Sequence, residues 1–154
     1  MSGFLKNLAG GLLIATGLSG GIAHAQPTTR GIEITGTWAR ISTTGEVNAY
    51  FDILNHGPDG NSLLSATTPV AEKVTLNRLR MKAGNPRGDD LSEIKVSAAG
   101  RTTLKPGNYY LALAELKGPV APGTVVPLTL HFTHGPDVQV EAKVTNQLLG
   151  NRGR

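Results

Sequence analysis

The stretch VNAYFDIL at residues 47–54 places an apolar side chain at every second position, starting from its first residue. This alternation is typical of a β-strand that buries one face and leaves the other face polar. Similar β-rich runs follow at regular spacing, separated by clusters of Gly, Pro, Asn and Asp. They lie at residues 31–40, 62–66, 73–81, 91–96, 109–116, 125–132 and 138–144. In the first of them, Ile32, Ile34 and Trp38 follow a rough period of two.

Turn signals connect these runs. The tetrapeptide His-Gly-Pro-Asp occurs at residues 56–59 and again at 134–137, and we interpret both copies as hairpin connections. Residues 106–108 and 121–123 contain further Pro-Gly turns. After residue 26, no segment repeats its apolar residues with the 3.6-residue period of a helix over three turns. The pattern therefore predicts an all-β domain, a sandwich or small barrel of about eight short, mainly antiparallel strands.

The composition excludes several classes of protein. The chain has 154 residues, which suits one domain, and a formal net charge of +4. Because it contains no cysteine, it has no disulfide, thiolate metal site, lipid-modified cysteine or cysteine nucleophile. The modest content of charged residues, 17%, argues against a disordered acidic chain and against a coiled coil.

The first 25 residues have the layout of a secretory signal peptide. A single charge at Lys6 precedes a Gly-rich apolar stretch, which ends at the cleavage-site pattern Ala23-His24-Ala25. The alternatives are an uncleaved membrane anchor and cleavage after Ala23. We expect a protein secreted to a bacterial periplasm. Its parts would be the signal peptide 1–25, an extension 26–30, a domain at 31–145 and a flexible basic tail at 146–154, with no membrane span after residue 26.

Several motifs together resemble one family. They are WAR at residues 38–40, NAYF at 48–51, VTLN at 74–77, LKPGNYYLAL at 104–113 and GTVVPLTLHF at 123–132. In these motifs the chain is similar to the PCuAC-type periplasmic copper chaperones. The resemblance implies a cupredoxin-like β-sandwich, and it implies the delivery of Cu(I), and often Cu(II), to the copper centre of a respiratory oxidase.

The ligand positions of that family are occupied by other residues in this chain. The family binds copper through His, Met, His and Met at fixed spacing, and the resemblance places these positions at Asn77, Gly88, Tyr110 and Ala112. Cu(I) is a soft cation that prefers thioether and imidazole ligands. An amide, a protonated phenol and two residues without a donor do not supply them. We therefore expect that the family copper site is lost and that the protein has no cofactor, so that copper is implied by the resemblance alone.

A few other residues are candidate copper ligands. His131, His134 and Met81 form one set, although the simpler interpretation is a strand residue, a turn residue and a core residue. His56 has the position of a solvated turn histidine. Cleavage after Ala23 would leave His24 at the amino terminus, where its amine and its imidazole bind Cu(II).

A basic cluster is the remaining candidate site. Arg78, Arg80 and Lys82 alternate along one predicted strand, and Arg87 follows them. These cations either prevent a solvated strand edge from pairing with another chain, or form a patch that binds an acidic partner or an anion. Nucleic acid is an unsuitable partner, because the net charge is low and no aromatic residues interleave with the basic ones.

Three functional hypotheses follow. The first is a member of the copper-chaperone family that has lost its copper site and serves as an accessory or partner-binding module, with a protein partner in the cell envelope. The second is a working copper carrier that uses His131, His134, Met81 or an amino-terminal His24. The third is a small periplasmic enzyme. The sequence favours a protein that is not an enzyme, because no local catalytic motif is present in the predicted domain.

Overall fold

The computed structural model describes residues 31–146, which form ten strands and no helix. The strands are β1 (Ile32–Ile41), β2 (Val47–Asn55), β3 (Asn61–Thr67), β4 (Ala71–Lys82), β5 (Asn85–Leu91), β6 (Ile94–Val96), β7 (Arg101–Thr103), β8 (Tyr109–Leu116), β9 (Val125–Phe132) and β10 (Val138–Thr145). Within this range, no helix has the length and apolar character needed to cross a membrane. The predicted signal peptide, the extension and the tail beyond Asn146 lie outside the described residues.

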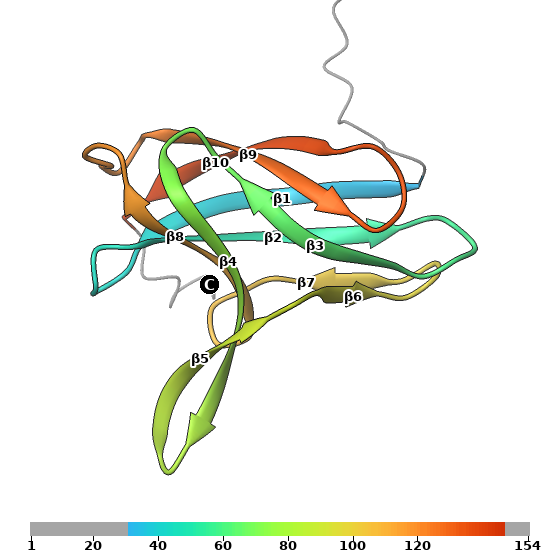
Figure 1. Ribbon diagram of the computed structural model, residues 1–154, viewed down its shortest axis with the longest axis horizontal. Helices are drawn as coiled ribbons and strands as arrows, with labels where there is room; N and C mark the ends of the chain where they lie inside the picture. The colour runs from blue at the N-terminus through green and yellow to red at the C-terminus, as the bar shows by residue number, and fades with distance from the viewer. Residues whose placement is uncertain (1–30, 147–154) are drawn as a thin grey trace, which may run out of the picture.

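The strands pair along one continuous path that folds over on itself (Figure 1). Their order is β5-β4-β8-β2-β1-β10-β9-β3-β6, and β7 pairs with β2 beside this path. Strands β1 and β10 are parallel, and the other strand pairs in the path are antiparallel. Strand β3 also contacts β4, so that the two ends of the path approach each other. This arrangement confirms the predicted all-β, cupredoxin-like sandwich.

The core lies between the layers and contains the apolar face predicted for residues 47–54. Val47, Ala49, Phe51 and Ile53 of β2 are at most 1% exposed and belong to the main hydrophobic cluster. Buried, mostly aliphatic residues from β1, β3, β4, β6, β8, β9 and β10, together with Leu104, complete this cluster. Each fully buried side chain of this kind stabilises the fold by about 1.5–3 kcal/mol. Because the inner face of β2 is used for packing, Asn48, Tyr50 and Asp52 project from the opposite face.

The structure corrects the expected period in β1. An irregularity in the register between Thr35 and Trp38 places one extra residue in this strand, and Gly36 has a φ of +62° there. A left-handed residue is typical of a β-bulge, and glycine adopts it without steric cost. The bulge turns Trp38 away from the face that Ile32 and Ile34 share. Trp38 is instead the register partner of Tyr50, on the outer face of the sheet.

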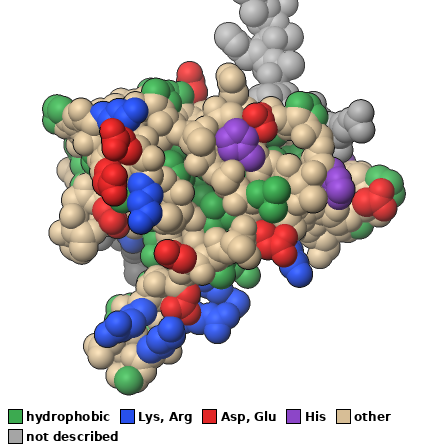
Figure 2. Space-filling view, in the orientation of Figure 1, with side chains coloured by type: hydrophobic (Ala, Val, Ile, Leu, Met, Phe, Trp, Pro, Cys, Tyr) green, Lys and Arg blue, Asp and Glu red, His purple; other side chains and the backbone are tan. Residues whose placement is uncertain are grey.

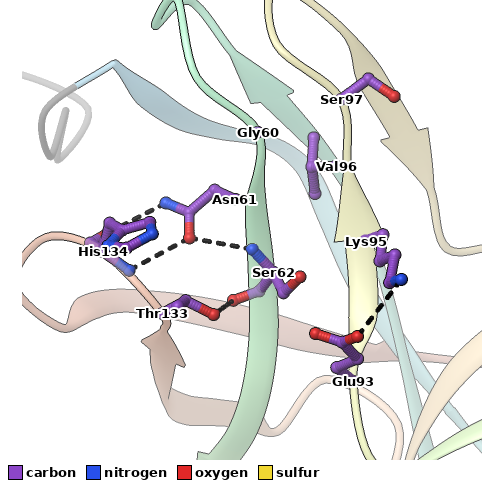
Figure 3. A pocket seen from close by; sticks show the side chains of 9 residues that line it. All are labelled: Gly60, Asn61, Ser62, Glu93, Lys95, Val96, Ser97, Thr133 and His134. Atoms are coloured by element: carbon purple, nitrogen blue, oxygen red, sulfur yellow. Dashed lines mark hydrogen bonds and ion pairs between the residues drawn. The ribbon is translucent and has the colours of Figure 1, made fainter.

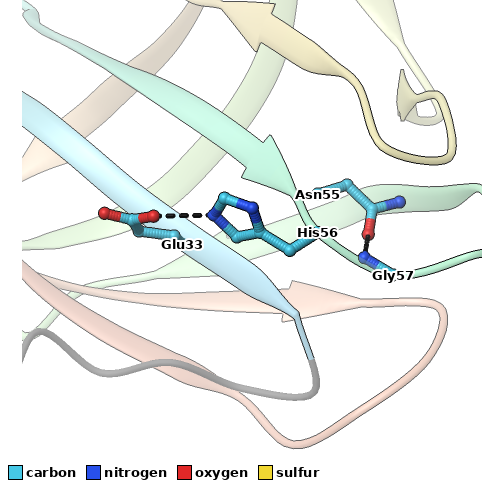
Figure 4. A network of polar contacts seen from close by, with 4 residues as sticks. All are labelled: Glu33, Asn55, His56 and Gly57. Atoms are coloured by element: carbon cyan, nitrogen blue, oxygen red, sulfur yellow. Dashed lines mark hydrogen bonds and ion pairs between the residues drawn. The ribbon is translucent and has the colours of Figure 1, made fainter.

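The structure also corrects one of the two expected hairpins. Residues 134–137 join β9 and β10, which are paired antiparallel and form a hairpin. Residues 56–59 join β2 to β3, two strands that are not neighbours in the sheet. Asn55 builds this turn. Its Nδ2 donates to Asp59 O over 2.8 Å, and its Oδ1 accepts from Gly57 N over 2.9 Å (Figure 4). The tetrapeptide predicts a turn in both places but does not predict how the flanking strands pair.

Two strands were not expected from the sequence. Strand β5 contains Asn, Pro, Gly and two Asp residues, which are typical of turns, and β7 has only 3 residues. The run predicted at residues 91–96 is divided, because Leu91 ends β5 and β6 begins at Ile94. Pairing with β4 holds β5 in an extended conformation despite its composition, which is the usual way that context overrides strand propensity.

Candidate functional site

Three of the four positions that the family resemblance assigns to ligands meet where β5 leaves the sandwich. Asn77 on β4 is the register partner of both Tyr110 on β8 and Asp90 on β5. A Cβ atom added to Gly88 would collide with the Tyr110 hydroxyl and would lie 3.8 Å from Asn77 Oδ1. The backbone therefore brings Asn77, Gly88 and Tyr110 together, although they are distant in the sequence.

Ala112 is the fourth position, two residues beyond Tyr110 on the same face of β8. It pairs with Thr75 of β4 on one side and with Asn48 of β2 on the other, and it is 7% exposed. Its methyl group has no electron pair to donate. Asn48 Oδ1 is buried and has no hydrogen-bond partner among the described residues. The alternation in residues 47–54 indicated that Asn48 faces outward. Nothing in the local sequence indicated that its amide oxygen lacks a hydrogen-bond partner.

The Asn77 side chain is buried and fixed by its own strand. The residue is 5% exposed, and its Nδ2 donates to Thr75 Oγ1 over 2.8 Å and to Thr75 O over 3.3 Å. These hydrogen bonds compensate the cost of burying an amide. They also use the nitrogen end of the side chain, so that only the amide oxygen is directed toward Gly88.

The Tyr110 phenol is protonated at neutral pH. Burial raises its pKa above the ordinary value of 10.0, and the negative potential of Tyr50, Glu46 and Asp90 raises it further. A neutral phenol is a weak ligand for a soft metal ion. The hydroxyl of Tyr110 therefore occupies the space beside Gly88 without providing an anionic donor.

An aromatic cluster continues the same sheet face toward β1. The rings of Trp38 and Tyr50 are stacked, with their centroids 4.5 Å apart and their planes inclined by 28°. The guanidinium carbon of Arg40 lies 5.7 Å from the Tyr50 centroid. Tyr50 is 1% exposed although it lies outside the main core, because these neighbours cover it. A stacked aromatic pair of this kind contributes about 0.5–1.5 kcal/mol beyond the burial of its area.

His56 is paired with an acid on the neighbouring strand. Its Nε2 lies 2.7 Å from Glu33 Oε2, and the imidazole side chain is 56% exposed (Figure 4). This is the solvated turn histidine that the sequence suggested, with the addition of one carboxylate partner.

His131 and His134 have separate hydrogen-bond partners. The ring of His131 lies between Asp137 Oδ1, 2.8 Å from Nδ1, and Thr67 Oγ1, 3.3 Å from Nε2. His134 lies in the turn after β9, where its backbone N and O bond to the side chain of Asn61. Within residues 31–146, no group of three His, Cys, Asp or Glu side chains is arranged to hold a metal ion.

Met81 lies near the far end of the β4–β5 hairpin and is 68% exposed. The structure thus corrects the expectation that it is a core residue. Strands β4 and β9 do not pair, so strand pairing does not bring Met81 beside His131. The outer part of β4 has no second layer against it, and this explains why the apolar side chain remains exposed.

The four basic residues do gather on one element. Arg78, Arg80 and Lys82 lie on β4, and Arg87 on β5 is the register partner of Arg80. The hairpin therefore contains the whole cluster predicted from the sequence.

A polar pocket of about 330 Å³ lies on another part of the molecule (Figure 3). Asn61 and His134 border it on one side, and the Lys95–Glu93 ion pair, with 3.6 Å between Nζ and Oε1, borders it on the other. It was not predicted, because its walls come from three segments that are far apart in the sequence. The residues that line it are Gly60, Asn61, Ser62, Glu93, Lys95, Val96, Ser97, Thr133 and His134.

Comparison of the sequence with known proteins identifies one family. The model of the family described as "Putative lipoprotein LpqE-like" matches residues 32–144. A curated relative, described as "Putative lipoprotein Lxx21020" of Leifsonia xyli subsp. xyli, is 25% identical over 115 residues. That match covers 74% of this chain and 69% of the relative.

Comparison of the structure identifies the fold. The copper-bound PCuAC domain from PmoF2 is 18% identical, with a TM-score of 0.65, and the match covers 80% of this chain and 99% of that domain. The Cu(I) form of DR1885 from Deinococcus radiodurans is 25% identical, with a TM-score of 0.63, over 84% of this chain and 85% of that protein. These neighbours confirm the family resemblance found in the sequence. The chain thus belongs to the LpqE-like lipoprotein family and has the PCuAC fold.

Proposed function

We propose that this protein is a PCuAC-fold module of the cell envelope that does not carry copper at the family's ligand positions. In this proposal it acts as an accessory or partner-binding protein. The lipoprotein description of its family supports an envelope location, and a periplasmic site fits the predicted signal peptide. The names of its relatives describe lipoproteins and copper-binding domains, which supports binding rather than catalysis as its role.

One observation supports the proposal more than any other. Three of the positions that the resemblance assigns to ligands, Asn77, Gly88 and Tyr110, lie together, but the Tyr110 hydroxyl fills the space that a side chain at position 88 would need. The nitrogen of Asn77 is used by Thr75, and Ala112 has no donor. A soft Cu(I) ion finds neither thioether nor imidazole among these groups, so this donor set does not fit copper.

The second candidate function is copper carriage by residues outside the family's ligand positions, because the structural neighbour DR1885 has been solved in its Cu(I) form. It would use His131, His134 or Met81, or His24 outside the described residues. The ring of His131 is already bonded to Asp137 and Thr67, and Met81 lies on a strand that does not pair with β9. We therefore favour the first candidate.

A competition titration tests the proposal. The secreted protein, mixed with a strong Cu(I) chelator, should leave all of the copper with the chelator. Weak Cu(II) uptake at His131 would be lost in His131→Ala and kept in His56→Ala, which removes an imidazole from a different strand end. Tight one-to-one Cu(I) binding by the unmodified protein would refute the proposal and favour copper delivery.

A further inference from the structure

The β4–β5 hairpin extends beyond the body of the sandwich (Figure 1). Pairing between β4 and β8 ends at Arg78, and from there β4 pairs with β5 alone in the sheet. The two strands are joined by Ala83 and Gly84, whose φ angles of +49° and +79° are those of a tight type I′ turn. Residues 79–88 thus form a compact two-stranded arm, of which residues 80–87 are exposed.

One face of the arm has an excess of positive charge. Arg80, Lys82 and Arg87 lie on this face of the arm, and Arg78 and a single carboxylate, Asp89, lie on the same face at its base. The face therefore has an excess of three positive charges. Asp89 is shared, since it lies 2.8 Å from the ammonium of Lys82 and 3.7 Å from Arg80 Nε. Arg80 and Arg87 are directly opposite each other. Like charges in this position destabilise a strand pair, so folding alone does not account for them.

The other face of the arm is apolar near its end. Met81 is 68% exposed and pairs with Pro86, and Leu79 pairs with Gly88 closer to the body. Figure 2 shows Lys and Arg side chains gathered along the arm, with a hydrophobic side chain at its tip. The tip thus combines exposed cations and exposed apolar side chains within a few residues.

We propose that the tip of this hairpin docks on an anionic phospholipid surface. In this arrangement, Arg80, Lys82 and Arg87 contact lipid phosphates, and Met81 enters the boundary between headgroups and acyl chains. A bilayer binds cations at its headgroups and apolar side chains just below them, and it does not need a surface complementary in shape to the arm. The arm fits this partner better than an acidic protein, because it offers two accessible faces and no groove. The inference is independent of whether copper binds.

Vesicle co-sedimentation of the secreted protein tests this inference. Binding should require phosphatidylglycerol in phosphatidylcholine vesicles, and it should weaken as salt is added. Each basic residue contributes about fivefold to such binding, so Arg80→Gln with Arg87→Gln should weaken it more than tenfold. Met81→Ser should weaken it several-fold with no change in salt dependence. The matched control is Arg101→Gln with Lys143→Gln, which removes the same charge from the exposed body of the sandwich and should leave binding nearly unchanged.

Two outcomes would overturn the inference. One is an equal loss with the hairpin pair and with the control pair, because it would indicate a response to net charge alone. The other is the absence of vesicle binding at low salt, and binding to polyglutamate in its place would assign the arm to an acidic protein. The arginine substitutions relieve a like-charge pair and should not unfold the domain, which circular dichroism checks. A copper titration of the same samples keeps this test separate from the proposed absence of copper.

Discussion

Gly88 and Tyr110 form a complementary pair of residues. The space beside a glycine in a strand normally indicates a close approach of another group, and here that group is the phenol of Tyr110. The backbone at Gly88 is not in the left-handed region, so the glycine is needed for space and not for conformation. A substitution at Gly88 therefore has an effect that depends on Tyr110.

We predict that Gly88→Ala lowers the free energy of unfolding by about 1 kcal/mol, the lower range for overpacking. In a Tyr110→Phe background the colliding oxygen is gone, and the same substitution should be neutral or slightly stabilising. Urea denaturation of the four proteins in this double-mutant cycle measures the coupling. An equal loss of stability in both backgrounds would mean that the two side chains do not meet.

The raised pKa of Tyr110 predicts how stability depends on alkaline pH. Above the ordinary value of 10.0 the unfolded chain releases the phenolic proton while the folded protein retains it. The unfolded state then binds fewer protons, so stability decreases as pH rises through this window. Tyr110→Phe should remove this part of the decrease. Urea midpoints measured across the window would contradict the prediction if both proteins lost stability in parallel.

At the level of strands, one bulge decides which face of the sheet carries the aromatic cluster. The alternation in residues 31–40 predicted the strand, because apolar periodicity is a local property. It did not predict that Trp38 faces outward, because the extra residue at Gly36 shifts the register after Thr35. Strand β5 was missed for a related reason: Asn, Pro, Gly and Asp are typical of turns, and only the pairing with β4 keeps the segment extended.

We predict that Gly36→Ala destabilises the domain by about 1 kcal/mol, since a Cβ is strained at a φ of +62°. No other atom would be touched, because the space around that Cβ is open. Gly118→Ala is the matched control, as its site is equally open and its backbone is not left-handed. Thermal unfolding of both variants checks this, and equal transition temperatures would show that the bulge does not need glycine.

For the whole molecule, the sequence predicted the sandwich and the approximate position of eight strands, and the resemblance assigned four ligand positions. It could not predict that the Tyr110 hydroxyl fills the space beside Gly88, because that contact depends on the pairing of β4 with both β5 and β8. The 330 Å³ pocket was hidden for the same reason. Contacts between distant segments follow from the complete fold and leave no trace in local periodicity.

In the function we propose, the scaffold of the copper site remains while its donors are gone. Restoring the four side chains tests this most directly, with Asn77→His, Gly88→Met, Tyr110→His and Ala112→Met combined in one protein. Changing Tyr110 at the same time removes the hydroxyl that would otherwise collide with a side chain at position 88. Circular dichroism confirms that the variant is folded before it competes with a Cu(I) chelator. We predict that the restored protein takes one Cu(I) from the chelator and that the unmodified protein takes none. Tight Cu(I) binding by the unmodified protein, or none by a folded restored protein, would contradict the proposal.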